Sequence, residues 1–340
     1  MRSDTIRPYD SDRDHAACLR ILEEIGWGLG DAKDNGPLFE RYTSDCDVLV
    51  AELEGEAESW AICRKAWMRY LDVDLPVGFI TGVGTSRIAR GRGLALAATA
   101  HSIAQSASSG ATVARLGIFD QGFYDKLGFG TLAYVRLSTI DPRNLSVPKL
   151  NRSPIRLSAQ DASELHDCRM RRMRWHGACS LVGAGATECE MLWEKTQFGL
   201  GFRGDDGNLT HCMVLKPKGE NGPYSLEWLA YESPEQFIEL LSVLKSLGDQ
   251  VHGVTMREPA HVQLQDMLEA PFRTYLTRKG STFAVNPRSN AYEQARILDL
   301  EKCVEAVRLP GETVRFNLVL EDRVAHWLPE DADWRGLGGS

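Results

Sequence analysis

The sequence predicts an α/β (α+β) protein that contains two copies of one fold with a mixed central sheet, followed by a short helix–hairpin segment. In the first third of the chain, an apolar run at residues 76–85 leads through a glycine- and arginine-rich turn into an alanine-rich helix. The start of the chain has a later echo, because Ile6-Arg7 and Ile155-Arg156 each precede a predicted helix. With 340 residues and 43% hydrophobic content, the chain is long enough for two or more cores at ~100–200 residues per domain.

The elements of the first copy follow from periodicity and from end signals. Residues 76–85 predict a strand, and the helix after the turn carries apolar residues at helical spacing until Ser108-Ser109-Gly110 ends it. A strand over 112–119 and a short helix capped by Gly128 come next. A β-rich run over residues 129–140 then completes the first copy.

The turn between this strand and helix has the properties of a phosphate cradle. The first turn of a helix carries unpaired N–H groups and a partial positive charge, which suit a pyrophosphate. Gly91 and Gly93 keep side chains away from the anion, while Arg87, Arg90 and Arg92 add charged donors. A solvated loop is the alternative for such a string taken alone. The predicted cradle consists of Arg90, Gly91, Arg92, Gly93, Leu94 and Ala95.

The second copy predicts the same fold without the cradle. Its expected elements are a meander over 198–203, 210–215 and 224–231, a helix from Glu235, a strand over 251–256, a helix over 261–269 and a β segment around 282–285. Where the cradle should lie, the sequence reads Glu232-Ser233-Pro234-Glu235. Its two carboxylates would repel a pyrophosphate. We therefore expect the second copy to keep the fold and to have lost the cofactor.

The last part of the chain predicts a helix and one hairpin. Asp299 can cap a helix over residues 300–308. The alternation typical of a half-buried strand is carried by Val314, Phe316, Leu318 and Leu320. Asp322-Arg323 can form the turn, and residues 324–328 would form the returning strand. These elements are too few for a core of their own, so they must pack on the rest of the chain.

Charge and composition exclude several classes of partner. A net charge of −8 and a pI near 5.6 argue against nucleic acid, which needs a basic face, and favour cationic amines. The eight cysteines form no C-x-x-C pair and indicate reduced thiols, and the eight histidines show no ligand spacing, so no metal site is expected. The polar N-terminus and the absence of a run of ~18 apolar residues predict no signal peptide and no membrane span. We expect a cytoplasmic protein.

Two motifs within residues 75–140 resemble those of the GCN5-related N-acetyltransferase (GNAT) superfamily. The coenzyme A signature of that family, Q/R-x-x-G-x-G/A, is matched by Arg90, Gly93 and Ala95, and its later F-Y-x-x-x-G-F segment is matched by residues 123–129. Arg87 and Gly91 stand where the family commonly has proline and arginine. The resemblance implies acetyl-CoA as co-substrate.

Over the whole chain, the resemblance is to the enhanced-intracellular-survival (Eis) type of acetyltransferase. It implies a catalytic domain over 1–147, a degenerate second acetyltransferase domain over 148–288 and a partial sterol-carrier-like segment over 289–340. That segment is shorter than the third domain of the family, so a natural short form and a truncated sequence both stay open. The family also implies a homo-oligomer, in particular a hexamer, and a base at the C-terminal carboxylate. In this sequence that would be the carboxylate of Ser340, and water or a distant carboxylate stay open as the base.

The resemblance further implies direct acetyl transfer from acetyl-CoA to a primary amine. The Val83 N–H would polarise the thioester carbonyl, and Thr85 would face the pantetheine on the same strand edge. Tyr124 would hand a proton to the departing thiolate, because a phenol with a pKa near 10 suits a thiol near 8.5. An interface tyrosine with a satisfied hydroxyl is the alternative. Trp27 could line the acceptor site or be structural.

Two functions are compatible with these patterns. The first is an N-acetyltransferase that acts on a small polycationic amine or a lysine side chain, which the acidic balance favours. The second is a non-catalytic protein that senses coenzyme A or binds lipid. Replacing Tyr124 by Phe distinguishes them, because a hydroxyl donor serves turnover and is superfluous for binding.

Overall fold

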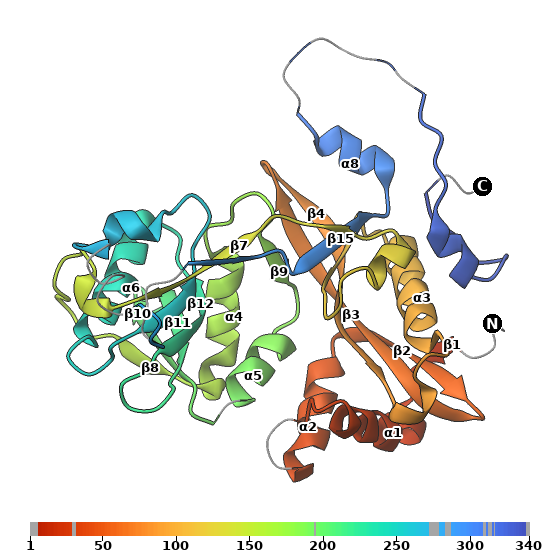
Figure 1. Ribbon diagram of the computed structural model, residues 1–340, viewed down its shortest axis with the longest axis horizontal. Coiled ribbons are helices and arrows are strands. Elements are labelled where there is room, and N and C mark those ends of the chain that lie inside the picture. Colours follow the sequence, from red (N-terminus) through yellow and green to blue (C-terminus); the bar gives the residue numbers. More distant parts are fainter. Residues whose placement is uncertain are drawn as a thin grey trace. The chain divides into compact units, whose positions relative to one another are not determined.

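The computed structural model describes residues 6–28, 32–193, 195–271, 279–282, 287–308, 311, 315 and 317–337 (Figure 1). The chain forms two compact units. Unit 1 comprises Met1–Leu132, Trp175–Gly185 and Tyr292–Ser340, and unit 2 comprises Ala133–Arg174 and Ala186–Ala291. Each unit therefore draws on segments that are far apart in the sequence. The three-domain division with boundaries after residues 147 and 288 stays a prediction.

Unit 1 is built on a mixed sheet, as the predicted fold class requires. Its strands lie in the order β1-β2-β3-β4-β5-β15-β6, with β9 paired to β3. All neighbouring strands are antiparallel except β4 and β5, which are parallel. The strands are β1 (Ile6–Pro8), β2 (Cys46–Leu53), β3 (Glu56–Tyr70), β4 (Val73–Thr85), β5 (Val113–Gly117), β6 (Gly130–Thr131), β9 (Cys179–Leu181) and β15 (Glu293–Ile297).

Helices cover both faces of this sheet. On one face, α1 (Ser11–Glu24) and α2 (Ala32–Thr43) pack around Trp60 of β3. On the other face, α3 (Leu94–Ser108) packs against the adjacent residue, Ala61. Successive side chains of a strand point to opposite faces, so neighbouring residues of β3 serve the two different helix layers. The predicted helix after the glycine-rich turn is confirmed.

Two single turns of 3-10 helix flank the sheet. The first, η2 (Arg87–Ala89), joins β4 to the turn before α3. The second, η3 (Tyr124–Leu127), follows β5 and is the predicted short helix that bears the tyrosine. Gly128 ends it with a φ of 79°, a left-handed conformation that glycine adopts without steric cost. The predicted cap at Gly128 is confirmed.

Unit 2 repeats this architecture with a second mixed sheet, in the order β14-β7-β13-β12-β11-β10-β8. Only β12 and β13 are parallel. Its strands are β7 (Val135–Ile140), β8 (Ile155–Leu157), β10 (Phe198–Arg203), β11 (Leu209–Lys216), β12 (Tyr224–Ala230), β13 (Val254–Arg257) and β14 (Arg288–Asn290). The predicted meander, with the helix and strand that follow it, is confirmed.

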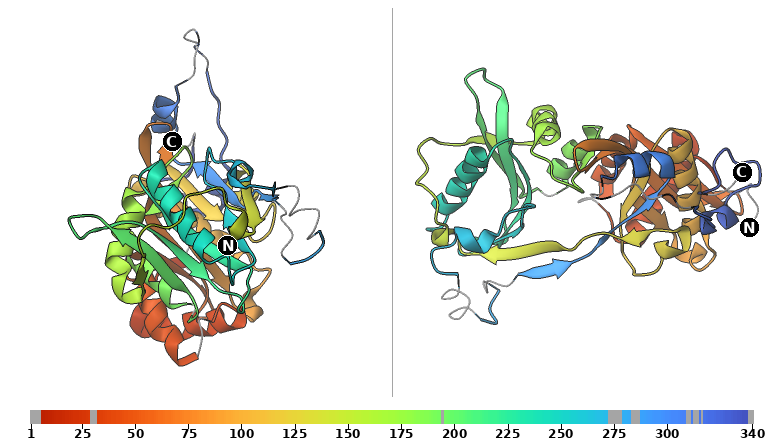
Figure 2. Two further views of the ribbon diagram at one scale, coloured as in Figure 1. Left: turned by 90° about the vertical axis from the view of Figure 1, so that its left-hand side faces the viewer. Right: turned by 90° about the horizontal axis from the view of Figure 1, so that it is seen from above.

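Helices also lie on both faces of the second sheet. The right-hand view of Figure 2 shows the strands of unit 2 between the teal α6 (Pro234–Ser246) and the yellow-green α4 (Ala162–Arg171). Met213 of β11 packs under α6, whereas its neighbour Cys212 packs under α4. A further helix, α5 (Gly185–Leu192), follows β9. The two apolar layers correspond to the two helix layers of unit 1.

The sequence predicted that the β-rich run over residues 129–140 completes the first sheet. In the structure, this run is divided between the two sheets. Only β6 joins unit 1, and β7 instead pairs with β13 and β14 in unit 2. In the first sheet, the position between β5 and β6 is occupied by β15, which pairs with both strands. The two units therefore exchange strands. An apolar alternation fits either sheet equally well, which is why periodicity did not reveal the exchange.

Two elements expected late in the second copy differ from the prediction. The prediction of a helix over residues 261–269 is wrong, because only η6 (Leu264–Met267), a single 3-10 turn, forms there. The backbone next to η6 pairs instead with the loop after β7: the Ser146 N–H donates to the Met267 carbonyl, and the Glu269 N–H donates to the Asn144 carbonyl. The expected β segment around 282–285 lies mostly outside the described residues.

The predicted C-terminal hairpin is also wrong. The helix before it is confirmed as α8 (Leu300–Ala306), with Asp299 as its cap. Residues 324–328 do not return as a strand, because the Asp322 side chain accepts the Val324 N–H and caps η7 (Arg323–Trp327). Val314 and Phe316 lie outside the described residues, and Leu318 is exposed and in no strand.

Candidate active site

The open edge of β4 is the central feature of the site in unit 1. The parallel strand β5 pairs with β4 only from Val77 to Ile80 and ends at Gly117. β4 continues to Thr85, still paired with β3 on its other side. Within the described part of the chain, no strand pairs with β4 beyond Ile80 on the β5 side. The two parallel strands therefore separate and leave backbone groups available.

The amides of Val83 and Thr85 face this open edge. The Ser86 N–H points toward β3, because it donates to the Glu58 carbonyl at 2.9 Å. Backbone N–H groups point alternately to the two sides along a strand. The N–H groups of Thr85 and Val83, which lie one and three residues before Ser86, therefore point away from β3.

The glycine-rich turn lies directly after this edge and starts α3. Gly91 and Gly93 have φ angles of 76° and 81°, in the left-handed region. A Cβ at Gly91 would meet no atom within 4 Å, so the backbone conformation, not lack of space, requires glycine there. Arg90 and Arg92 are exposed beside the turn.

The start of α3 offers backbone donors. Gly93 is its N-cap and has no side chain, so no side-chain cap covers the first amides of this fully described helix. Leu94 is buried among alanines of the sheet and fixes the start of the helix, while Ala95 is half-buried. Arg87 is held differently from the cradle residues, because its N–H donates to the Glu24 carboxylate at 2.6 Å.

Tyr124 lies in an aromatic environment next to the same edge. Its ring contacts those of Phe119, Phe123 and Phe129 at centroid distances of 5.9, 4.9 and 6.0 Å. It belongs to an apolar cluster that α3 also enters and against which Val83 packs. Burial raises the pKa of Tyr124 to about 12, above the value near 10 that the sequence argument assumed. The phenol therefore stays protonated at neutral pH.

Trp27 lies next to a buried tryptophan that the sequence argument did not single out. Trp27 is 47% exposed and follows α1, and its ring centroid is 6.1 Å from that of Trp60. Trp60 packs directly over Gly84, where a Cβ would lie 2.5 Å from the indole ring. The alternating glycines at 82 and 84 were the available sequence signal for this close approach.

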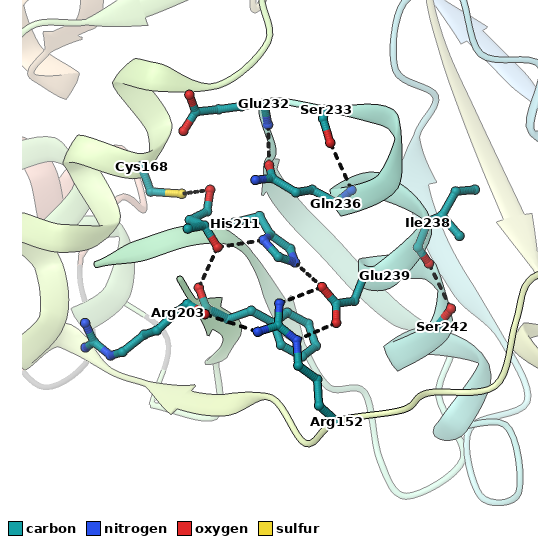
Figure 3. A network of polar contacts seen from close by, with 12 residues as sticks. Arg152, Cys168, Arg203, His211, Glu232, Ser233, Gln236, Ile238, Glu239 and Ser242 are labelled. Carbon is teal, nitrogen blue, oxygen red and sulfur yellow. Dashed lines mark hydrogen bonds and ion pairs between the residues drawn. The ribbon is translucent and has the colours of Figure 1, made fainter. Parts of the chain in front are cut away.

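The corresponding helix start in unit 2 is closed by side chains. Ser233 is the N-cap of α6, and its hydroxyl accepts the Gln236 N–H at 3.4 Å. The Gln236 side chain in turn accepts the Glu232 N–H at 2.7 Å, as Figure 3 shows. A hydrogen bond from Ser233 lowers the pKa of Glu235. This helix start is thus capped and negatively charged, unlike that of α3.

A polar network lies below this helix start in unit 2 (Figure 3). Arg152 binds both carboxylate oxygens of Glu239 at 2.7 and 2.8 Å, and Glu239 lies 3.0 Å from Nε2 of the buried His211. The hydrogen bond from Arg152 lowers the pKa of Glu239, and burial lowers that of His211. The network borders a cavity of about 520 Å³. It ties the segment before β8 to β11 and α6.

Among the residues with described positions, no group of three or more His, Cys, Asp and Glu side chains could hold a metal ion. No helix in the described ranges has the length and apolar character needed to cross a bilayer.

Comparison with known proteins finds a family match in the first part of the chain. The profile of the family described as acetyltransferase (GNAT) domain matches residues 11–132. No curated protein matches the sequence. The match includes the open edge of β4, the glycine-rich turn and Tyr124.

Solved structures share the fold over most of the chain. A probable N-acyltransferase from Enterococcus faecalis V583 is 16% identical with a TM-score of 0.75, over 95% of this chain and 79% of that one. Eis1 from Mycobacterium abscessus is 17% identical with a TM-score of 0.67, over 88% and 75%. A GCN5-related N-acetyltransferase from Anabaena variabilis is 12% identical with a TM-score of 0.67, over the same shares. At these identities the likeness concerns the fold.

Proposed function

We propose that this protein moves acetyl directly from acetyl-CoA to the primary amine of a cationic acceptor. The premise is that residues 11–132 are a GNAT acetyltransferase domain and that the chain is an acetyl-CoA-dependent N-acetyltransferase. The observation that carries the proposal is the open edge of β4 beside the uncapped start of α3. The edge supplies donors for a thioester carbonyl, and the helix start supplies donors for a diphosphate.

Acetyl-CoA would lie along this edge as the co-substrate. The amides and arginines of residues 90–95 would hold the diphosphate, and Thr85 would bind the pantetheine. The Val83 N–H would donate to the thioester oxygen as negative charge develops on it during attack by the amine. These donors belong to rigid elements, a paired strand and a helix start, which favours their precision as an anion site.

Tyr124 would stabilise the departing thiolate by a hydrogen bond. Its pKa of about 12 lies well above the ~8.5 of a thiol, so complete transfer of its proton would be unfavourable. The hydroxyl would therefore serve as a fixed donor to the developing thiolate. The proton that finally neutralises the sulfur would come from water or from the protonated nitrogen of the tetrahedral intermediate, which loses it as the amide forms. This refines the proton hand-off expected from the sequence.

The acceptor would be a small polycationic amine or a lysine side chain. The net charge of −8 favours a cation. The exposed Trp27 ring beside Trp60 offers an aromatic surface for an ammonium group. The base that removes the amine proton stays open, since Ser340 lies outside the described residues.

The remaining assignments are also proposals. The capped and acidic start of α6 supports loss of the cofactor from the second copy. A sterol-carrier-like character of residues 289–340, a cytoplasmic location and a homo-oligomer such as a hexamer rest on the sequence. Light scattering of the purified chain tests the last of these.

A thiol-release assay tests the function. Acetyl-CoA is supplied with a panel of spermidine, an aminoglycoside and a lysine peptide, each compared with its N-acetylated form. We expect release that depends on a free amine and that falls in Tyr124→Phe while coenzyme A still binds by calorimetry. Coenzyme A binding with no amine-dependent release from wild-type protein would support the alternative, a non-catalytic coenzyme A sensor or lipid-binding protein.

A further inference from the structure

The side chain of Arg296 ties the segment after β15 to the turn that carries Tyr124. We infer that Arg296 and Asp322 are positioning residues for Tyr124, holding η3 between β15 and the C-terminal segment, defined as residues 317–337. The inference rests on the proposed function, because it assigns these residues a role in the same reaction.

Arg296 contacts η3 from β15. Its side chain is 3% exposed, and its Nη1 donates to the carbonyl of Leu127, the last residue of η3. Its Nη2 pairs with Asp322 at 2.5 Å, and its guanidinium lies 5.2 Å from the Trp334 ring centroid. One planar group thus joins η3 to two points of the C-terminal segment.

A second contact from β15 reaches the other end of the same turn. The buried Gln294 donates from Nε2 to the carboxylate of Asp125 at 2.9 Å. Asp125 is the residue directly after Tyr124, and Leu127 lies three residues after Tyr124. Within η3, β15 therefore contacts both the residue next to Tyr124 and the last residue of the turn.

Asp322 organises the opposite side of this arrangement. One carboxylate oxygen accepts the Val324 N–H at 3.1 Å and begins η7, and the other accepts the Leu337 N–H at 2.8 Å in addition to Arg296. Val324 is fully buried in the apolar cluster that also contains Tyr124. The carboxylate thus joins Val324 and Leu337 of the C-terminal segment to Arg296, which in turn binds η3.

The need for such a support follows from the turn itself. A 3-10 turn of four residues has few hydrogen bonds of its own and cannot fix a side chain without help from its surroundings. A buried ion pair is weak evidence for stability, yet its directional bonds fix geometry more closely than apolar contacts do. Because small displacements of a reacting group can cost about a hundredfold in rate, the support bears on turnover.

The test compares two matched arginines of unit 1. Arg296→Lys keeps the positive charge but cannot bind Leu127 and Asp322 with one planar fork. Arg115→Lys makes the same change in another buried pair, between Arg115 and Glu293. Arg115 also donates to the Gly177 carbonyl, which lies outside η3. We expect Arg296→Lys to lower kcat about tenfold or more with KM for acetyl-CoA within about twofold, and Arg115→Lys to leave both unchanged.

A double-mutant cycle with Tyr124→Phe separates positioning from general stability. If Arg296 acts through the hydroxyl, Arg296→Lys causes no further loss of kcat in the Phe background. Fully additive losses would overturn the inference. Asp322→Asn, which keeps the size and one acceptor of the side chain, repeats the measurement should Arg296→Lys fail to fold.

A readout without catalysis distinguishes this inference from the proposed function. In protein labelled with carbon-13 at the tyrosine ζ position, the Tyr124 resonance is assigned by its absence in Tyr124→Phe. We expect Arg296→Lys to shift it and Arg115→Lys to leave it in place. An unshifted resonance contradicts the positioning role even in an active enzyme. A shifted resonance in a protein that never acetylates amines supports the positioning and rejects the proposed function alone.

Discussion

Gly93 and Ser233 hold the same position in the two units, as the N-cap of the helix that follows the parallel-paired strand. Gly93 adopts a left-handed conformation and offers no side chain, whereas Ser233 is extended and its hydroxyl accepts the Gln236 N–H. The first helix start is open to an external anion, and the second is satisfied by its own chain.

Ser233→Ala tests this difference on the side of unit 2. Loss of the cap leaves backbone amides without their side-chain acceptor, so the free energy of unfolding should fall by about 1 kcal/mol in urea denaturation. Coenzyme A binding measured by calorimetry should not change. Ser233→Asp, which can still cap, is the control and should keep wild-type stability.

Gly91→Ala tests the cradle. Alanine is strained at a φ of 76°, so the free energy of unfolding should fall by about 1–2 kcal/mol. Relief of that strain would move the turn, so coenzyme A should also bind about tenfold more weakly.

Gly207 provides the matched control for Gly91. It has a φ of 80° in a turn of unit 2, and a Cβ there would likewise meet nothing within 4 Å. Gly207→Ala should lose similar stability and keep full coenzyme A affinity. Equal affinity losses in both variants would argue against the cradle.

Gly84→Ala tests the contact with Trp60. A Cβ at 2.5 Å from a buried indole forces the ring or the strand to move, and overpacking of this kind costs about 1–3 kcal/mol. Gly130→Ala, in a strand of the same unit with nothing within 4 Å of the added Cβ, should be neutral. The midpoints of urea unfolding provide the comparison.

Tyr124 should make the protein sensitive to alkali. In the unfolded chain its phenol ionises near pH 10, whereas burial raises its pKa in the folded protein to about 12. Its contribution is fully present below pH 10 and is lost as the pH rises through 12, because only the unfolded state ionises in that window. We expect wild type to lose about 2–3 kcal/mol relative to Tyr124→Phe between pH 10 and 12.

Unfolding curves at pH 8, 10 and 12 would show this difference. Tyr9, whose pKa is also raised by burial to about 12, is present in both proteins and cancels in the comparison. A constant difference between wild type and Tyr124→Phe across these pH values would contradict the burial of the hydroxyl.

The sequence predicted local features well where local chemistry decides the structure. The start of α3 after Gly93 and the end of η3 at Gly128 were both expected, because each depends on a glycine at a helix terminus. The meander of unit 2 was expected from its turns and alternation.

Features that depend on distant partners escaped prediction. Residues 324–328 were expected to return as a strand, but the Asp322 cap and the burial of Val324 favour a helical turn there. Likewise, no local signal in residues 135–140 tells which of two similar sheets they join. The packing of Trp60 on Gly84 joins residues of two strands, and the glycine was the only sequence signal that indicated this close approach.

The exchange of β7 and β15 has a consequence for biosynthesis. Until residue 297 leaves the ribosome, the outer edge of β5 has no partner and exposes its backbone to other nascent chains. The usual vectorial order, in which an N-terminal domain matures before the rest is made, cannot apply here. A ribosome that stalls between the two exchanged strands would release a polypeptide with one sheet unfinished and prone to aggregate.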